Sequence, residues 1–407
     1  MKRHTAFSFL VGIGILVLSA RGAAAQGAQD ITIGERLSLQ SGILEEERAY
    51  WVYLPASYHD STYTPQRYPV LYLLDGDAHF HSASGVVQFM STGINGNIQI
   101  PEMIVVAIPN TNRTRDLTPT RSTVGYDGSE DTTLSASGGG ETFLRFIRDE
   151  LFPQIESAYR TLPYRVFVGH SFGGLLALHT LLERPDMFQA HVAIDPSLWW
   201  DRQALVARAE EQVRASRIPG GAVYISLANN PDLGMGDPMV MQTSGRAFAR
   251  SLEQAPNLRS AIRYFEEEDH GSVPLISLYH GLLHIFEGYK PLMSDIFQRP
   301  VALRDHFVRV SDRLGVDLLP PEPYVDQWGN AMLMFLNDAD KALALFRLNV
   351  TNYPNSPHAH FSLGEGYRAT GDSASAVVHY ERSLELNPDN EQARERIAAL
   401  AQPASRN

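Results

Sequence analysis

The chain has 407 residues, of which 44% are hydrophobic and none is cysteine, and its formal net charge at pH 7 is −12. This length and apolar content allow one large and one small hydrophobic core, which excludes a disordered tail or linker. The lack of cysteine excludes thiol catalysis and thiolate metal sites. The acidic balance makes nucleic acids and anionic membrane surfaces unfavourable partners.

The first residues have the composition of a secretory signal peptide. Lys2 and Arg3 are followed by an apolar segment at 7–20 and by the small residues 23–25. The apolar segment is shorter than the roughly 20 residues that span a bilayer. We therefore expect residues 1–25 to be cleaved, with no membrane insertion afterwards, and the protein to be periplasmic or secreted.

Residues 26–290 are predicted to form one domain, in which short β-rich segments alternate with helical periodicity. This alternation is typical of an α/β fold with a mostly parallel sheet. The segment 113–140, rich in Thr, Ser, Gly and Asp, is predicted to be a long surface loop. Strands are expected at 31–39, 50–54, 70–74, 104–108, 165–168, 192–194, 223–227 and 262–265, and helices at 141–159, 172–182, 202–215, 238–254 and 273–287.

A serine motif stands between a predicted strand and a predicted helix, where residues 169–174 read Gly-His-Ser-Phe-Gly-Gly. A G-x-S-x-G sequence in this setting predicts a nucleophile elbow and the α/β-hydrolase fold, with Ser171 as nucleophile. The backbone N–H of Phe172 is then expected to donate to the oxyanion. A second donor is expected after the strand at 70–74, where Gly76 allows close backbone approach and Asp77 supplies the N–H.

His270 is the predicted base, because it follows the strand at 262–265 on a glycine-containing loop, after the serine in the chain order of this fold. His170 is interpreted as pointing away from the serine. His280 and His284 have a spacing that suits zinc, but no third ligand is evident in the sequence. We therefore expect no metal and no organic cofactor.

The identity of the triad acid stays open. Asp232 is favoured because it lies nearest the end of the strand at 223–227, while Asp237 and Asp195 are the other candidates. A Ser–His dyad without an acid is a fourth. For substrate binding, the candidates are Trp199 and Trp200 as an aromatic wall and Arg113 as a partner for an anionic group, with an Arg113–Asp116 ion pair as the alternative.

The last part of the chain repeats itself. Asn337, Ala342, Phe346 and Pro354 recur 34 residues later as Gly371, Ala376, Tyr380 and Pro388. This helix–turn–helix period resembles the tetratricopeptide repeat. Residues 331–407 are therefore predicted to be helical repeats, with 291–330 as a connector. Because two repeats seldom fold alone, we expect them to pack on the hydrolase domain, on a second copy or on a protein partner.

Five motifs occur in order along the first domain, at 68–76, 112–119, 169–174, 195–201 and 269–272. Together they resemble the putative esterase family, which includes esterase D and enterochelin esterase. The resemblance implies hydrolysis of carboxylic esters such as siderophore trilactones, feruloyl esters or S-formylglutathione, and acyl transfer in some relatives. It also implies an acid after the strand at 223–227, where this chain has Asn229 and Asn230.

The sequence therefore predicts an exported serine esterase that acts on a small-molecule ester through an acyl-enzyme intermediate. One alternative is an acyltransferase on the same scaffold. The other is an inactive hydrolase-like domain that serves as a binding module. The intact Ser171 and His270 favour an enzyme.

Overall fold

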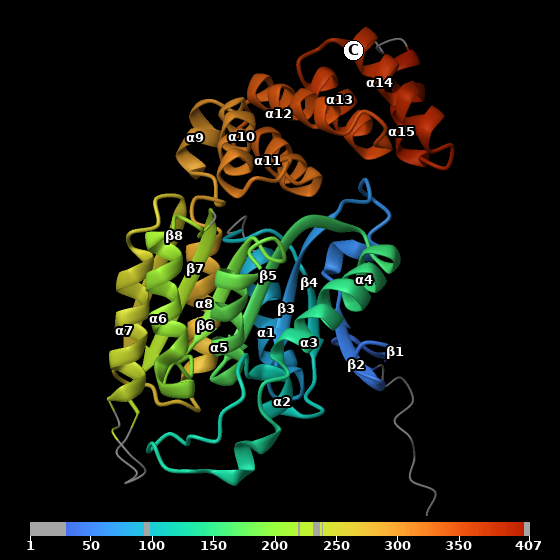
Figure 1. The fold of residues 1–407 in the computed structure, drawn as a ribbon. Coiled ribbons are helices and arrows are strands. Elements are labelled where there is room, and N and C mark those ends of the chain that lie inside the picture. Colours follow the sequence, from blue (N-terminus) through green and yellow to red (C-terminus); the bar gives the residue numbers. More distant parts are fainter. Residues whose placement is uncertain (1–29, 93–97, 219, 231–236, 238, 403–407) are drawn as a thin grey trace, which may run out of the picture. The chain divides into compact units, whose positions relative to one another are not determined.

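In the part of the chain that the computed structural model describes, which is residues 30–92, 98–218, 220–230, 237 and 239–402, eight strands form one sheet (Figure 1). The predicted signal peptide lies outside these residues. The strand order is β1-β2-β4-β3-β5-β6-β7-β8. The strands are β1 (Glu35–Ser41), β2 (Glu46–Tyr53), β3 (Tyr68–Leu74), β4 (Ile104–Ile108), β5 (Thr161–His170), β6 (Ala190–Ile194), β7 (Gly221–Ala228) and β8 (Leu258–Phe265).

The predicted mostly parallel sheet is confirmed. The pairs β1–β2 and β2–β4 are antiparallel, whereas β4, β3, β5, β6, β7 and β8 run parallel to one another. Parallel strands bring their carboxyl ends to one edge of the sheet, where ligands bind in open α/β folds. The residues that follow β3, β5, β6, β7 and β8 therefore meet at this edge.

Helices cover both faces of the sheet, because alternate residues of a strand point to opposite sides. Leu71 and Leu73 of β3 share a core with Val87 of α1, whereas Val70 and Tyr72 share one with the helices of the other face. One face carries α1 (Gly76–Thr92) and α8 (Val273–Ile285), and the other carries α3 (Gly140–Phe146), α4 (Phe152–Ala158), α5 (Phe172–Glu183), α6 (Trp200–Arg214) and α7 (Val240–Leu252).

Several predicted elements differ from the structure. Helix α1 was not expected, and the helix predicted at 141–159 is divided by a π-helical turn, Ile147–Leu151, that separates α3 from α4. The predicted loop 113–140 contains α2 (Arg113–Leu117) and a 3-10 turn at Thr132–Ala136. The predicted connector is itself helical, with α9 (Met293–Gln298), α10 (Ala302–Leu314) and the start of α11 (Glu322–Met334).

The two copies of the helical repeat match in backbone conformation and in burial at equivalent positions. Asn337 and Gly371 both have a left-handed backbone, with φ of 50° and 84°, at equivalent helix–helix turns. Phe346 and Tyr380 are both fully buried at equivalent positions. The helices are α11, α12 (Ala339–Asn352), α13 (Pro357–Ala369), α14 (Ser373–Leu386) and α15 (Glu391–Ala401).

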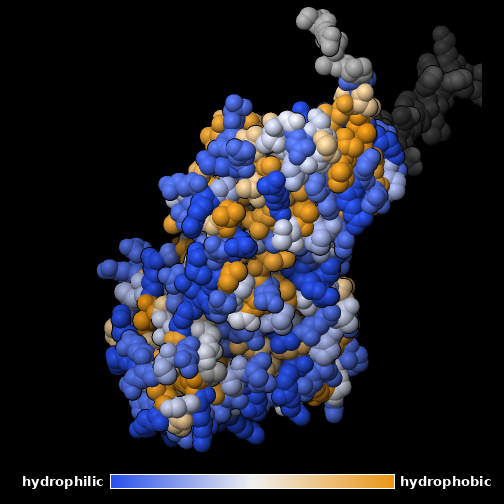
Figure 2. Space-filling view, turned by 90° about the horizontal axis from the view of Figure 1, so that it is seen from above, coloured by the Kyte–Doolittle hydropathy of each residue, from blue (hydrophilic) through white to orange (hydrophobic). Residues whose placement is uncertain are grey.

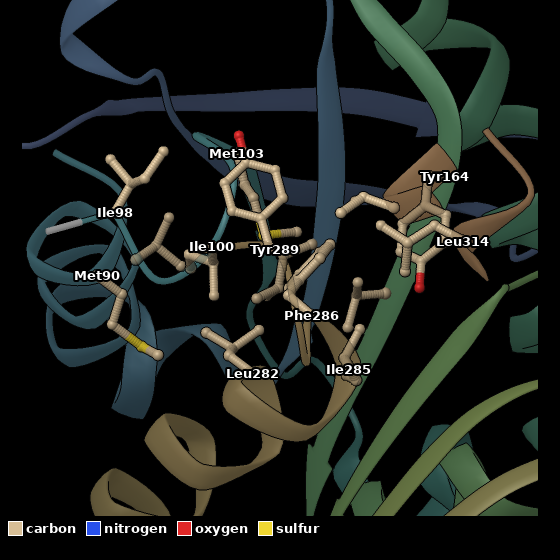
Figure 3. Close-up of a cluster of buried hydrophobic side chains, with 14 of the residues drawn as sticks. Met90, Ile98, Ile100, Met103, Tyr164, Leu282, Ile285, Phe286, Tyr289 and Leu314 are labelled. Carbon is tan, nitrogen blue, oxygen red and sulfur yellow. The ribbon is translucent and has the colours of Figure 1, made fainter. Parts of the chain in front are cut away.

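The tail shares a core with the sheet domain, as one of the sequence-based expectations proposed. One cluster of buried residues runs from the sheet through α1, α8 and α10 to α11, α12 and α13. Figure 3 shows part of it, with Leu282 of α8 and Phe286, which directly follows α8, near Ile100, and Leu314 of α10 beside Tyr164. Burial of this apolar surface holds the tail to the sheet domain.

A buried carboxylate adds a polar link between the same parts. Glu322 of α11 accepts a hydrogen bond from the backbone N–H of Thr64 at 2.8 Å and another from the hydroxyl of Ser356.

Figure 2 shows hydrophobic patches among polar side chains on the face seen from above. Large apolar side chains of the tail that stay exposed are Met334, Phe335, Leu336 and Val378. Among the described residues, no helix has the length and apolar character to cross a bilayer.

Candidate active site

Ser171 occupies a strained turn between β5 and α5. Its φ of 59° and ψ of −117° lie outside the regions that residues with a side chain normally adopt. A Cβ atom at Gly169 would lie 2.2 Å from the carbonyl oxygen of Gly173, so only glycine fits there. The turn places Ser171 at the N-terminus of α5, where the helix dipole favours negative charge. The predicted nucleophile elbow is therefore present.

The segment after β6 packs against this elbow. The backbone N–H of Ser171 donates to the carbonyl of Ile194 at 2.9 Å, and the N–H of Ser197 donates to the carbonyl of Ser171 at 3.1 Å. The hydroxyls of Ser171 and Ser197 lie 3.1 Å apart and share a hydrogen bond. In this structure, therefore, Ser197 holds the Ser171 hydroxyl.

His270 is paired with Asp195, the acid that follows β6. Its Nδ1 lies 2.7 Å from Oδ2 of Asp195, whose side chain is completely buried. The acid also accepts hydrogen bonds from the backbone N–H of Ala228 and from Nδ2 of Asn230, both at 3.0 Å. With Nδ1 donating to the acid, Nε2 of His270 is the nitrogen that can accept a proton.

The acid favoured from the sequence, Asp232, lies outside the described residues, so the preference for it stays a prediction. The position beside Nδ1 of His270 is taken by Asp195, the third candidate from the sequence. The Asp237 carboxylate accepts instead from the backbone N–H of Met239 at 2.9 Å. The reason is topological: the end of β6 lies beside the elbow, so an acid there approaches the histidine as readily as one after β7.

His170, which precedes Ser171 in the elbow, lies beside the predicted base. Its ring centroid is 4.3 Å from that of His270 and 5.9 Å from that of His79. Burial lowers the pKa of His170 to about 3, with further lowering from His270 and His79. The ring therefore stays neutral near pH 7 and packs against the base. In the sequence, the signal for the contact between the His170 and His270 rings is the position of His170 directly before Ser171 in the elbow motif.

The turn after β3 joins the elbow through an ion pair. Arg113 Nε lies 2.7 Å from Oδ1 of Asp75, and its Nη2 donates to the carbonyl of His170 at 3.1 Å. Burial raises the pKa of Asp75, but the hydrogen bonds from Arg113 and Asn110 and the nearby positive charge together outweigh burial, so the net pKa is lowered. Arg113 therefore pairs with Asp75, whereas Asp116 pairs with Arg48 and Arg115, which corrects the predicted Arg113–Asp116 ion pair.

The predicted oxyanion donors both lie in the first turns of helices at this edge. Phe172 is the first residue of α5, and Asp77 is the second residue of α1. The N–H groups of a first turn have no acceptor within their own helix. The Asp77 side chain is turned to Asn110, whose backbone N–H and amide reach it at 3.3 Å and 3.2 Å. The backbone N–H groups therefore remain the candidates for an oxyanion.

The two tryptophans after β6 have different environments. Trp200 is buried, and its indole N–H donates to Oγ1 of Thr120 at 3.1 Å, so it supports the fold and its predicted place in the substrate wall is corrected. Trp199 is half-buried and contacts the rings of Tyr126 and Phe172 at 5.5 Å and 5.9 Å. Tyr126, which the sequence did not single out, donates to the carbonyl of Asp237 at 2.9 Å.

Comparison with known families matches residues 41–274 to the family described as "Putative esterase", which covers more than half of the chain. The chain belongs to this family. Residues 357–390 match the tetratricopeptide repeat, in agreement with the repeat read from the sequence.

The relatives of this esterase-family chain include siderophore esterases. It is 31% identical over 191 residues to the ferri-bacillibactin esterase BesA of Bacillus subtilis, a match that spans 45% of this chain and only 65% of that protein. It is 28% identical over 252 residues to the siderophore triacetylfusarinine C esterase of Aspergillus fumigatus, spanning 54% of this chain and 82% of the relative. Among solved structures, an IroE-like serine hydrolase from Shewanella oneidensis is 34% identical, with a TM-score of 0.71, and the match covers 78% of this chain and 98% of that one.

Proposed function

We propose that this protein is a serine esterase that hydrolyses siderophore-type carboxylic esters. The observation that carries the proposal is the pair formed by His270 and the buried carboxylate of Asp195, next to a strained Ser171 at a helix N-terminus. This combination supplies a base, an orienting acid and a half-buried nucleophile. The siderophore esterases among the relatives support the substrate class.

In the proposed reaction, the Ser171 hydroxyl exchanges Ser197 for Nε2 of His270. Nε2 takes the hydroxyl proton while Oγ bonds to the ester carbonyl carbon, and the N–H groups of Phe172 and Asp77 hold the resulting oxyanion. The alkoxide leaves with the proton from His270 and an acyl-enzyme remains. Water, deprotonated by His270, then attacks the acyl carbon and releases the acid and Ser171.

The half-buried Trp199 supports an aromatic substrate group near the nucleophile. Its ring lies between those of Phe172, which follows the nucleophile, and Tyr126. An aromatic cluster of this kind favours aryl groups through edge-to-face and apolar contact.

Hydrolysis of p-nitrophenyl butyrate and of a catecholate trilactone tests the function. We expect the wild-type protein to cleave both, and Ser171→Ala to lose at least roughly 10³-fold in kcat. The matched control is Ser197→Ala, which removes the neighbouring hydroxyl and should keep kcat within about tenfold of wild type. A Ser171→Ala protein with most of the wild-type rate would disprove the proposed nucleophile.

Export is part of the same proposal and is supported by the composition of residues 1–25. Expression of the full chain in a Gram-negative host, followed by fractionation, should recover a shortened protein outside the cytoplasm. Recovery of the full-length chain in the cytoplasm would contradict export and leave the proposed chemistry unaffected.

A further inference from the structure

Strand β7 ends beside the acid of the proposed triad without supplying an acid itself. One oxygen of Asp195 accepts from the N–H of Ala228, and the other accepts from both Asn230 Nδ2 at 3.0 Å and His270 Nδ1 at 2.7 Å. Because an ionised carboxylate has only acceptors, Asn230 must turn its NH₂ group toward it. Its Oδ1 is buried, with no hydrogen-bond partner in the described structure.

The position of Asn230 relative to the base is set by the residue before it. The backbone N–H of Asn229 donates to the carbonyl of Glu268 at 2.8 Å, and its side-chain amide donates to the carbonyl of Glu266 at 3.0 Å. Both acceptors belong to the segment that leads from β8 to His270. The end of β7 is therefore fixed both to the acid after β6 and to the loop of the base.

We propose that Asn230 is a positioning residue that holds the Asp195 carboxylate in the orientation in which Oδ2 faces His270. This inference rests on the proposed function of Ser171, His270 and Asp195. The amide also keeps the site at a single negative charge. A carboxylate at residue 230 would stand within hydrogen-bond distance of Asp195, and the repulsion between the two negative charges would favour protonation of His270, which pairs with Asp195.

Two substitutions separate orientation from charge. Asn230→Ala removes the donor, and we expect kcat on p-nitrophenyl butyrate to fall on the order of 10- to 100-fold, because a misplaced base slows proton transfer. Its KM should stay within about threefold of wild type, since Asn230 is not placed against the substrate.

Asn230→Asp keeps the shape of the side chain but adds a negative charge. It should move the acidic limb of the kcat/KM profile upward, on the order of one pH unit, because the added charge favours a protonated His270.

The matched control for charge is Asn257→Asp, an exposed position just before β8 and so at the opposite end of the strand from the site. Among the described residues, the titratable groups next to His270 include His170 and Asp269 besides Asp195, and none of these changes in the two variants. Asn257→Asp should therefore keep the wild-type profile.

A readout independent of turnover completes the test. In protein labelled with ¹⁵N-histidine, the NMR titration midpoint of His270 should rise in Asn230→Asp and stay unchanged in Asn257→Asp. Wild-type kcat in Asn230→Ala, or an unchanged midpoint in Asn230→Asp, would overturn the proposed role of Asn230. If the wild type showed no Ser171-dependent turnover but the midpoint moved, the proposed function would fail while the positioning by Asn230 would hold.

Discussion

Asp195 carries backbone strain at the centre of the site. Its φ of 38° places it in the left-handed region directly after β6. The surrounding structure holds it there, because its N–H donates to the carbonyl of Ser226 at 2.9 Å and its carboxylate accepts three hydrogen bonds. Ser171 is strained in the same way. Such strain persists where neighbours fix the conformation, which is common at functional sites.

Replacing Asp195 by asparagine tests its role. The amide keeps the shape of the side chain but removes the charge that orients His270 and stabilises its protonated form, so we expect kcat to fall by roughly 10³- to 10⁴-fold. The measurement is kcat on p-nitrophenyl butyrate. Asp237→Asn and Asp232→Asn serve as comparisons and should stay near the wild-type rate. Loss of activity in Asp232→Asn together with wild-type activity in Asp195→Asn would restore the preference from the sequence.

At the scale of elements, the repeat in the tail depends on turns with a left-handed residue. Gly371 has φ of 84° between α13 and α14, and Asn337 adopts φ of 50° at the equivalent turn. Glycine adopts this conformation without cost, and asparagine tolerates it better than most residues. The two turns close equivalent helix pairs, which the sequence indicated by their separation of 34 residues.

Gly371→Ala should destabilise the protein by about 1 kcal/mol, because alanine is strained at positive φ. A Cβ atom at Gly371 would meet no other atom within 4 Å, so a steric clash does not contribute. The control is Gly85→Ala, an equally open position within α1, where helix propensity predicts a gain of about 0.5–1 kcal/mol. Urea denaturation measures both, and equal shifts in the two variants would contradict this account.

Local patterns predicted some elements well and others poorly. Strand β4 was placed correctly because its apolar run is buried throughout and ends before Pro109. Helix α1 was missed because its polar residues, among them His79 and His81, hide the helical periodicity. Ser171 and His270 follow from motifs and chain order. The pairing of Asp195 with His270 does not, because it depends on where two loops 75 residues apart meet in space.

At the scale of the whole molecule, buried histidines make the fold sensitive to acid. His191 of β6 is fully buried, and neither ring nitrogen has a hydrogen-bond partner in the described structure. Burial lowers its pKa to about 3. The unfolded chain takes up this proton near the ordinary pKa of histidine, about 6.5, so stability is present above that pH and is lost as the pH falls from there toward 3.

In His191→Phe, the free energy of unfolding should fall less steeply with decreasing pH than in the wild type, by up to about 1.4 kcal/mol per pH unit. The reason is that one proton fewer is taken up on unfolding. Urea denaturation at pH 7 and pH 5 gives the change in unfolding free energy. The control is His59→Gln, which alters an exposed histidine and should leave the pH dependence as it is in the wild type. An equal loss between the two pH values in wild type and His191→Phe would contradict the argument.

Covalent labelling tests the central claim, that Ser171 is the activated nucleophile, most directly. A fluorophosphonate reacts preferentially with a serine that an adjacent base activates, and Ser197 offers an internal comparison because its hydroxyl lies 3.1 Å from that of Ser171. Mass spectrometry of the intact wild-type protein should show one adduct, and peptide mapping should place it on Ser171. No adduct, or an adduct on Ser197, would contradict the account.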